Sequence, residues 1–331
     1  MRRREFIAFI GATCMLPRSA RSHQSAKVYR IAIVHPSHPI SELNEQSRFR
    51  YYREFFGGLR QLGYVEGHNL VIERFSGEGR VEIYPKLARD VSASNPDLVF
   101  AISVSVVAAL KEATSTIPVV AMTSDPVGHG IAASISRPGG NITGVTVDAG
   151  LELWGKRLQL FREVVPTISK LGILAVRTNP ESAAMRGVAE KAGITVVGPS
   201  FVDNGSDEEY RNIFATVSQA GVDALFVDGS PVHITKRQLI GELAAQHRMP
   251  AIYPFRSFAE AGGLMAYGID LVEVFRQAAR AIDRILKGAN PADLPFYQPT
   301  KFEFVINRRA AKEIGLVVSE TLLAQADEVI E

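Results

Sequence analysis

The sequence predicts an α/β protein with two doubly wound, Rossmann-like lobes, each built on a parallel sheet. Short, β-branched and almost continuously apolar runs alternate with helix-like segments, which is typical of parallel strands covered by helices on both faces. The alternation begins at residue 29 and restarts at residue 152, so two βα series follow one another. The 331 residues, 46% hydrophobic and 22% charged, are enough for two such cores.

The first series contains four expected strands and three expected helices. The strands are the apolar runs YRIAIV (29–34), NLVIERF (69–75), DLVFAI (97–102) and IPVVAM (117–122). Between the first two runs, large apolar residues recur at helical spacing, which predicts an amphipathic helix. These residues are Phe49, Tyr52, Phe56 and Leu59. A second helix is expected to end near Ser92, and a third to cover 104–113.

The second series begins with a helix at 152–166 and a strand at 170–176. The runs ITVVGPS (194–200), DALFVDG (223–229) and PAIYPF (250–255) then alternate with helices near 182–192, 207–220 and 235–247. A helix (271–287), a proline-rich connection (LPFYQPT) and a strand (FEFVIN) remain. Because these elements come after the second lobe is complete, we expect the chain to cross between the lobes again.

The N-terminus has the pattern of an export signal. Three arginines (2–4) precede an apolar run from Phe6 to Leu16, which is shorter than the ~20 residues a membrane span needs. The stretch RREFI also resembles a twin-arginine signal. We assign residues 1–26 to signal and linker, with Ser22 as an allowed cleavage position. A buried N-terminal helix is the alternative.

Cys14 is the single cysteine and lies within this apolar run. A lipoprotein signal would place Leu where Gly11 stands, so lipidation of Cys14 is the weaker alternative. Removal of the signal would leave a mature chain without a cysteine. We therefore expect no disulfide, no thiolate nucleophile and no cysteine metal site.

Composition and motifs argue against several classes of function. The formal net charge is only +2, and no basic tract is interleaved with aromatic residues, so nucleic-acid binding is not expected. Phosphate-binding, nucleophile-elbow and zinc-protease motifs are absent from the sequence. The seven histidines lack metal-ligand spacing; His35 and His38 are the closest pair. We therefore expect no catalytic residue, no metal site and no cofactor.

The stretch GHGIAASISRPGGNITGVTVD (128–148) resembles a dinucleotide-binding fingerprint. A pyrophosphate turn requires its first glycine directly after a strand, whereas residues 123–127 intervene here. The stretch also follows the fourth expected strand instead of the first. We interpret Gly139 and Gly140 as a tight turn before the chain crosses between the lobes.

Polar residues follow several expected strands, at the sheet edges where open α/β proteins bind ligands. Ser103 and Ser105, with Arg256, are candidates to hold a carboxylate. Asp125 or Asp228 could receive a cationic group, and Tyr253 or Tyr267 could contact an apolar body. The predicted ligand-binding set is His35, Ser103, Ser105, Thr123, Ser124, Asp125, Asn179, Asp228, Tyr253, Arg256 and Tyr267. The alternative is that the serines are helix caps and the aspartates turn formers.

Several segments together resemble the ABC transporter substrate-binding proteins of the tryptophan/tyrosine type, which have the type I periplasmic-binding-protein fold. They are MRRREFI, GLRQLGYVEGHNLVIE (58–73), DPVGHGIAASISRPGGNITGV (125–145), AIYPFRSFAEAGGLMAYG (251–268), LPFYQPTKFEFVIN and ADEVIE. The resemblance implies a hinge of three crossings, near 141–146, 264–268 and 299–304. Lobe 1 would then comprise 27–145 and 266–298, and lobe 2 would comprise 146–265 and 299–331.

The resemblance also implies a function. It indicates a periplasmic, monomeric receptor that binds a small-molecule ligand, such as an aromatic amino acid or aromatic carboxylate, and presents it to an ABC permease and its ATPase. Two alternatives stay open: a ligand-sensing module of the same fold, and a periplasmic α/β enzyme.

Overall fold

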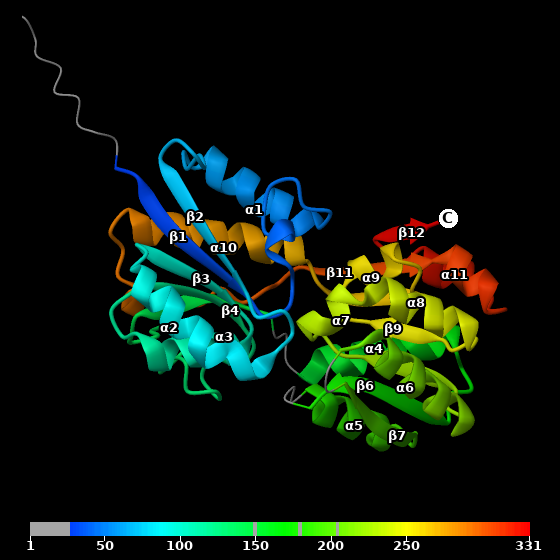
Figure 1. Ribbon diagram of the computed structural model, residues 1–331. Coiled ribbons are helices and arrows are strands. Elements are labelled where there is room, and N and C mark those ends of the chain that lie inside the picture. The colour runs from blue at the N-terminus through cyan, green and yellow to red at the C-terminus, as the bar shows by residue number, and fades with distance from the viewer. Residues whose placement is uncertain (1–26, 148–150, 178–180, 203–204) are drawn as a thin grey trace, which may run out of the picture.

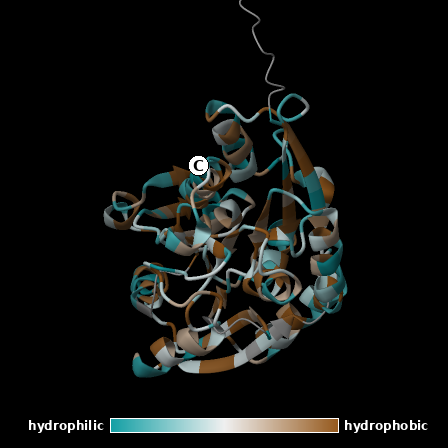
Figure 2. Ribbon diagram, turned by 90° about the vertical axis from the view of Figure 1, so that its left-hand side faces the viewer, coloured by the Kyte–Doolittle hydropathy of each residue, from teal (hydrophilic) through white to brown (hydrophobic). Residues whose placement is uncertain are grey.

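The predicted architecture of two parallel-sheet α/β lobes is confirmed by the structure, a computed structural model that describes residues 27–147, 151–177, 181–202 and 205–331 (Figure 1). Each lobe has its own sheet with helices on both faces. In Figure 2 the strands carry mainly hydrophobic colouring, whereas the outward turns of the helices are largely hydrophilic. Among the described helices, none is both long and apolar enough to cross a membrane.

The first lobe contains a five-stranded parallel sheet in the order β2-β1-β3-β4-β5. Its strands are β1 (Tyr29–His35), β2 (Leu70–Ser76), β3 (Leu98–Ile102), β4 (Val119–Thr123) and β5 (Ile142–Thr146). Its helices are α1 (Arg50–Gln61), α2 (Tyr84–Ser94), α3 (Val104–Ala113) and α10 (Leu271–Leu286), with short 3-10 turns at Ile40–Glu42, Val81–Ile83 and Pro291–Asp293.

The second lobe contains a seven-stranded sheet in the order β12-β11-β10-β9-β8-β6-β7, in which only the β10–β11 pairing is antiparallel. Its strands are β6 (Lys170–Val176), β7 (Thr195–Val202), β8 (Ala224–Val227), β9 (Ala251–Tyr253), β10 (Met265–Ile269), β11 (Phe302–Asn307) and β12 (Glu328–Ile330). Its helices are α4 (Leu151–Val164), α5 (Glu181–Lys191), α6 (Asp207–Gln219), α7 (Pro231–Thr235), α8 (Arg237–Gln246), α9 (Arg256–Glu260), α11 (Arg308–Glu313) and α12 (Glu320–Leu323).

Helix α10 belongs to the first lobe although it follows β10 of the second. Its buried face packs against α1, where the Phe275 ring lies 4.7 Å from Tyr51 and 6.0 Å from Phe55. Phe55 in turn stacks on Phe100 of β3 at 4.9 Å. Aromatic packing between segments more than 200 residues apart in sequence therefore holds α10 against the first lobe.

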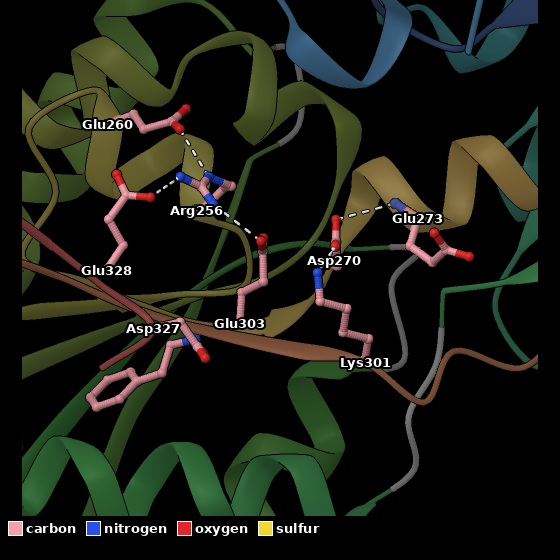
Figure 3. Close-up of polar contacts among 9 residues, drawn as sticks. Arg256, Glu260, Asp270, Glu273, Lys301, Glu303, Asp327 and Glu328 are labelled. Carbon is pink, nitrogen blue, oxygen red and sulfur yellow. Dashed lines mark hydrogen bonds and ion pairs between the residues drawn. The ribbon is translucent and has the colours of Figure 1, made fainter. Parts of the chain in front are cut away.

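Three hydrogen-bonded crossings join the lobes. Beside β5, the Thr146 amide donates to the Tyr297 carbonyl at 2.8 Å, so the first and third crossings run together. The second crossing follows β10, where the Asp270 amide donates to the Lys301 carbonyl at 3.2 Å. Lys301 Nζ also contacts the Asp270 carboxylate at 2.7 Å (Figure 3).

Three strands overlap the stretches expected to be crossings: β5, β10 and the start of β11. β5 pairs with β4, and β10 pairs with β9 and β11 up to Ile269. The lobe boundaries expected after residues 145 and 265 therefore each fall within a strand. Gly144 and Gly268 serve close backbone approach within these strands. A Cβ at Gly144 would lie 1.9 Å from the Ala121 carbonyl oxygen, and one at Gly268 would lie 1.8 Å from that of Pro254.

We predict opposite effects on stability for two glycine substitutions. Gly144→Ala should lower the free energy of unfolding by at least about 2 kcal/mol, because the new methyl group overlaps the backbone of β4. Gly57→Ala should raise it by about 0.5–1 kcal/mol, because Gly57 lies within α1 with open space where its Cβ would be. Urea unfolding measures both changes, and equal effects in the two variants would contradict the close approach at β5.

Candidate ligand-binding site

A cavity of about 210 Å³ lies between the two lobes. The first lobe contributes the carboxyl ends of β1, β3 and β4. The second contributes Val176, the loop from Gly229 to Val232, and Phe255, while Val147 and Leu271 come from the crossings. The apolar part of the lining includes Tyr51, Val81, Tyr84, Ile102, Val104, Met122, Ile234 and Phe275. Such a lining suits a ligand with an apolar or aromatic body.

The polar groups of the lining are hydroxyls and imidazoles. They belong to His35, Ser37, Ser103, Ser105, Thr123, Ser124, His129 and Ser230. Among the described lining residues there is no Asp, Glu, Lys or Arg. A charge on a ligand would therefore meet hydroxyl groups and backbone dipoles in this part of the site instead of an opposite side-chain charge.

Ser103 joins β3 to α3 at the wall of this cavity. It has a positive φ of 87°, which is a strained conformation for a residue other than glycine. Its Oγ accepts a hydrogen bond from the Val106 amide at 3.4 Å, so the residue also caps α3. The first amides of a helix lack intrahelical partners and carry partial positive charge. The end of α3 beside Ser105 is therefore suited to a carboxylate.

His35 has one ring nitrogen committed to the backbone. Its Nδ1 accepts hydrogen bonds from the amides of Ser37 (3.0 Å) and His38 (2.7 Å), so the proton of the neutral ring lies on Nε2. The side chain is 4% exposed, and its burial, together with the nearby His38, lowers its pKa well below the usual value. His35 therefore offers a neutral N–H donor to the cavity that it lines.

His38 supports His35 from behind. Its ring stacks between His35 (4.1 Å) and Phe49 (4.4 Å), and its Nδ1 lies 3.2 Å from the Tyr52 hydroxyl. Burial lowers the pKa of His38 to about 3, and the positive charges of Arg237 and Arg48 contribute. Both imidazoles are therefore neutral at physiological pH.

Asp228 lies behind the cavity wall and not in it. Its carboxylate accepts hydrogen bonds from the amides of Val176 (2.9 Å) and Ser230 (2.8 Å), and it lies 2.8 Å from Nδ1 of the buried His233. Burial alone would raise its pKa, but His233 and these hydrogen bonds lower it. Asp228 thus holds in place the segment of residues 229–232, which leads into α7, and does not itself face the cavity.

Five residues of the predicted set line the cavity: His35, Ser103, Ser105, Thr123 and Ser124. Asp125 is exposed and accepts a hydrogen bond from the Gly128 amide at 2.8 Å, so it forms a turn, which was our alternative interpretation. Tyr253 is 1% exposed and stacks on Phe258 in the core. Asn179 lies outside the described residues.

Arg256 and Tyr267 also lie away from this cavity. Glu260, Glu303 and Glu328 surround the Arg256 guanidinium group, with nitrogen–oxygen distances of 2.9 Å to Glu260 and 3.1 Å to Glu303 (Figure 3). Tyr267 lies on β10 at the hinge and stacks on Phe302 at 6.1 Å. Side chains at strand ends can point to either side of the sheet edge, which the strand pattern alone does not reveal.

Several lining residues were absent from the predicted set. Ser230 follows β8 and carried the same strand-end signal as Ser103. Tyr51, Tyr84, Phe255 and Phe275 come from helices and from the segment after β9, and only their aromatic character indicated burial. Phe255 follows an expected strand and carried the strand-end signal, whereas long-range packing brings the other three to the cavity, which no local pattern indicates.

Among the described residues, no group of three or more His, Cys, Asp or Glu side chains could hold a metal ion.

Comparisons with known proteins agree with this geometry. A family model described as ABC transporter substrate binding protein matches residues 40–330. A tyrosine-binding protein of Clostridioides difficile (strain R20291) is 24% identical over 283 residues, which cover 84% of this chain and 80% of that protein.

Two solved structures have the same fold. A conserved domain protein from Vibrio cholerae has a TM-score of 0.81 at 23% identity. An ABC domain in complex with L-Trp from Streptococcus pneumonia has a TM-score of 0.78 at 25% identity. Each comparison covers 92% of this chain and 100% of the other.

The buried imidazoles predict a specific loss of stability in acid. Because the folded-state pKa of His38 is about 3, the unfolded chain takes up its proton first as the pH falls below ~6.5. Stability is therefore complete above that pH and is lost toward pH 3, by about 2 kcal/mol for His38 at pH 5. In urea unfolding, the free energy of unfolding should fall between pH 8 and pH 5 by about 2 kcal/mol less in His38→Asn than in the wild type.

Asn at position 38 can still contact the Tyr52 hydroxyl. Any loss of stability that is the same at both pH values cancels when the two free energies of unfolding are subtracted. The exposed His68 provides a control, since His68→Gln should keep the wild-type difference. An unchanged difference in His38→Asn would show that His38 is not held neutral in the folded state.

Proposed function

Because the chain belongs to the family of ABC transporter substrate binding proteins, we propose that it is the solute-binding component of an ABC importer. It binds a small solute between its lobes and delivers it to the permease, whose ATPase drives transport. The observation that carries this proposal is the interlobe cavity, which has apolar walls and polar groups from strand ends of both lobes. The chain binds its solute without turnover.

The proposed solute is an aromatic amino acid or a related aromatic carboxylate. Two relatives support this class: one is described as tyrosine-binding, and the other was solved with L-Trp. Tyr51, Tyr84 and Phe255 provide aromatic surface for the ring. The carboxylate is held by Ser103, Ser105 and the amides at the start of α3, with His35 Nε2 as a further donor. Arg256, which is engaged by three glutamates, has no part in this.

Lobe closure is the proposed mechanism of capture. In the structure the lobes already touch near the cavity: Ser37 Oγ lies 3.4 Å from Thr235 Oγ1, and the Arg237 guanidinium carbon lies 4.4 Å from the centre of the Phe49 ring. A solute that contacts both lobes binds the closed arrangement better than the open one and shifts the population toward it.

The proposed location is the periplasm. Residues 2–16 of the sequence support export, and the pair Arg3–Arg4 supports the twin-arginine route. The folded receptor then acts as a monomer beside the permease.

Thermal shift tests the proposed solute class. L-tyrosine, L-tryptophan and aromatic carboxylates are added to the exported protein after it has been unfolded and refolded to remove bound ligand. At least one compound should raise Tm, because a ligand at 100 times its Kd stabilises by about 2.7 kcal/mol. Mass spectrometry of ligand released from the native protein provides an independent identification. If only non-aromatic solutes bind, the aromatic class is wrong although the receptor role stands.

Two substitutions of His35 should separate its role at the cavity from its role in the turn. His35→Asn retains an acceptor for the amides of Ser37 and His38 but removes the donor at Nε2. We expect its Kd for the solute to rise about tenfold, with Tm nearly unchanged. His35→Gln should show the reverse, because its amide reaches the cavity but leaves the turn without an acceptor. If both variants lose affinity and stability in proportion, His35 has only a structural role.

A further inference from the structure

A second cavity, of about 420 Å³, lies beside the solute cavity and also joins the two lobes. It begins where α1 begins, at Arg48 to Arg53, and faces α8 and α9 of the second lobe. Ile269, Leu271 and Val272 of the second crossing close one side. It shares the walls Tyr51, Phe255 and Leu271 with the solute cavity, but its chemistry differs.

The lining of this second cavity carries a surplus of positive charge. It contains five arginines and two glutamates. Both glutamates, Glu260 and Glu303, contact Arg256, which also pairs with Glu328 (Figure 3). Arg256 is therefore outnumbered three to one by its carboxylate partners, and the unpaired positive charge of the described lining lies at the opposite end, near α1. The remaining arginines are Arg48, Arg50, Arg53 and Arg237.

These four arginines have few anionic partners. Within the described chain, the ion pairs of this group consist of Arg48 with Glu42 at 3.0 Å. Arg53 and Arg237 donate instead to the backbone carbonyls of Ser47 (2.7 Å) and Ile234 (3.1 Å). Arg50 is exposed at the start of α1, where the helix dipole adds partial positive charge.

Two of these like charges meet across the gap between the lobes. The guanidinium carbons of Arg48 and Arg237 lie 5.1 and 4.4 Å from the centre of the same ring, that of Phe49. Burial and the nearby Arg48 lower the pKa of Arg237, while Tyr51, Glu260 and Glu42 oppose this in part. Closing the lobes thus brings arginines of opposite lobes together. Glu42, which is paired with Arg48, offsets part of this repulsion, and a further anion would offset more of it.

The wall also contains an unsatisfied donor. Ser257 Oγ is buried and has no hydrogen-bond partner in the described part of the chain. Buried hydroxyl groups are usually hydrogen-bonded, so such an atom in a cavity wall indicates a bound water or ligand. Because less than 1 Å² of this oxygen is accessible, an oxyanion in the cavity is held by the guanidinium groups and would reach this hydroxyl only after a shift of the wall.

We propose that this arginine-lined cavity binds one small oxyanion of the carboxylate or phosphate class and thereby stabilises the closed arrangement of the lobes. The anion bridges Arg48, Arg50 and Arg53 of the first lobe to Arg237 of the second. Because the full set of donors assembles only when the lobes are closed, the anion and the solute favour the same arrangement and bind cooperatively.

Inorganic phosphate is the probe for this site. Tm of the ligand-free protein is measured as phosphate replaces chloride at constant ionic strength. We expect Tm to rise with the logarithm of the phosphate concentration once this exceeds Kd, and the rise should begin at an about tenfold higher concentration in Arg50→Gln and in Arg237→Gln. Arg50 is exposed, so Arg50→Gln should fold normally. Arg309→Gln, an exposed change of the same charge, should leave the concentration at which the rise begins unchanged.

Phosphate also stabilises proteins generally, because it is excluded from their surfaces. That effect grows in proportion to the phosphate concentration, instead of with its logarithm, and is the same in every variant. A rise of only this kind, or no rise, would overturn the proposal. This measurement needs no solute, so its outcome is independent of the proposed function.

A second measurement tests cooperativity with an aromatic solute found by the thermal-shift panel. Phosphate should lower the Kd of that solute in the wild type but not in Arg50→Gln. If phosphate instead competes with the solute, the arginines hold the carboxylate of the solute itself, and the separate anion site is refuted.

Discussion

Close backbone packing fixes where the chain leaves each sheet to enter the hinge. Gly144 on β5 lies against the backbone of Ala121, and Gly268 on β10 lies against Pro254, so close that neither position has room for a Cβ. The third crossing is held beside the first by the pairing of Val145 with Tyr297. Because all three crossings are tied together, the carboxyl ends of both sheets face one gap, and the cavity between the lobes follows from that placement.

The groups around the solute cavity divide into those that face it and those that hold the wall. Ser103 and His35 face the gap, and both are held in unusual states: one has a strained φ, and the other has a fixed tautomer. Asp228 and His38 are buried behind the surface and position it. Preorganised, neutral donors of this kind suit binding by hydrogen bonds in an apolar setting, because they need no rearrangement when the solute arrives.

The two interlobe cavities differ in charge although they share walls. The solute cavity has no charged side chain among its described lining residues, whereas the neighbouring cavity has five arginines. Separation of this kind keeps ionic groups away from the apolar body of a solute. The proposed anion would lie where arginines of the two lobes, Arg48 and Arg237, approach the same Phe49 ring.

The sequence alone determined the two βα series, because burial of a parallel strand on both faces requires a nearly continuous apolar run, as in β3 and β4. The resemblance to the substrate-binding family is likewise confirmed. The polar strand ends in the sequence indicated Ser103, Ser105 and Thr123, and the structure has all three in the cavity lining. Tertiary structure decided the rest: that Asp228 and Arg256 satisfy partners elsewhere in the chain, and that β5 and β10 are strands despite their glycines. These outcomes depend on contacts between residues far apart in sequence, such as Arg256 with Glu328, which no local pattern encodes.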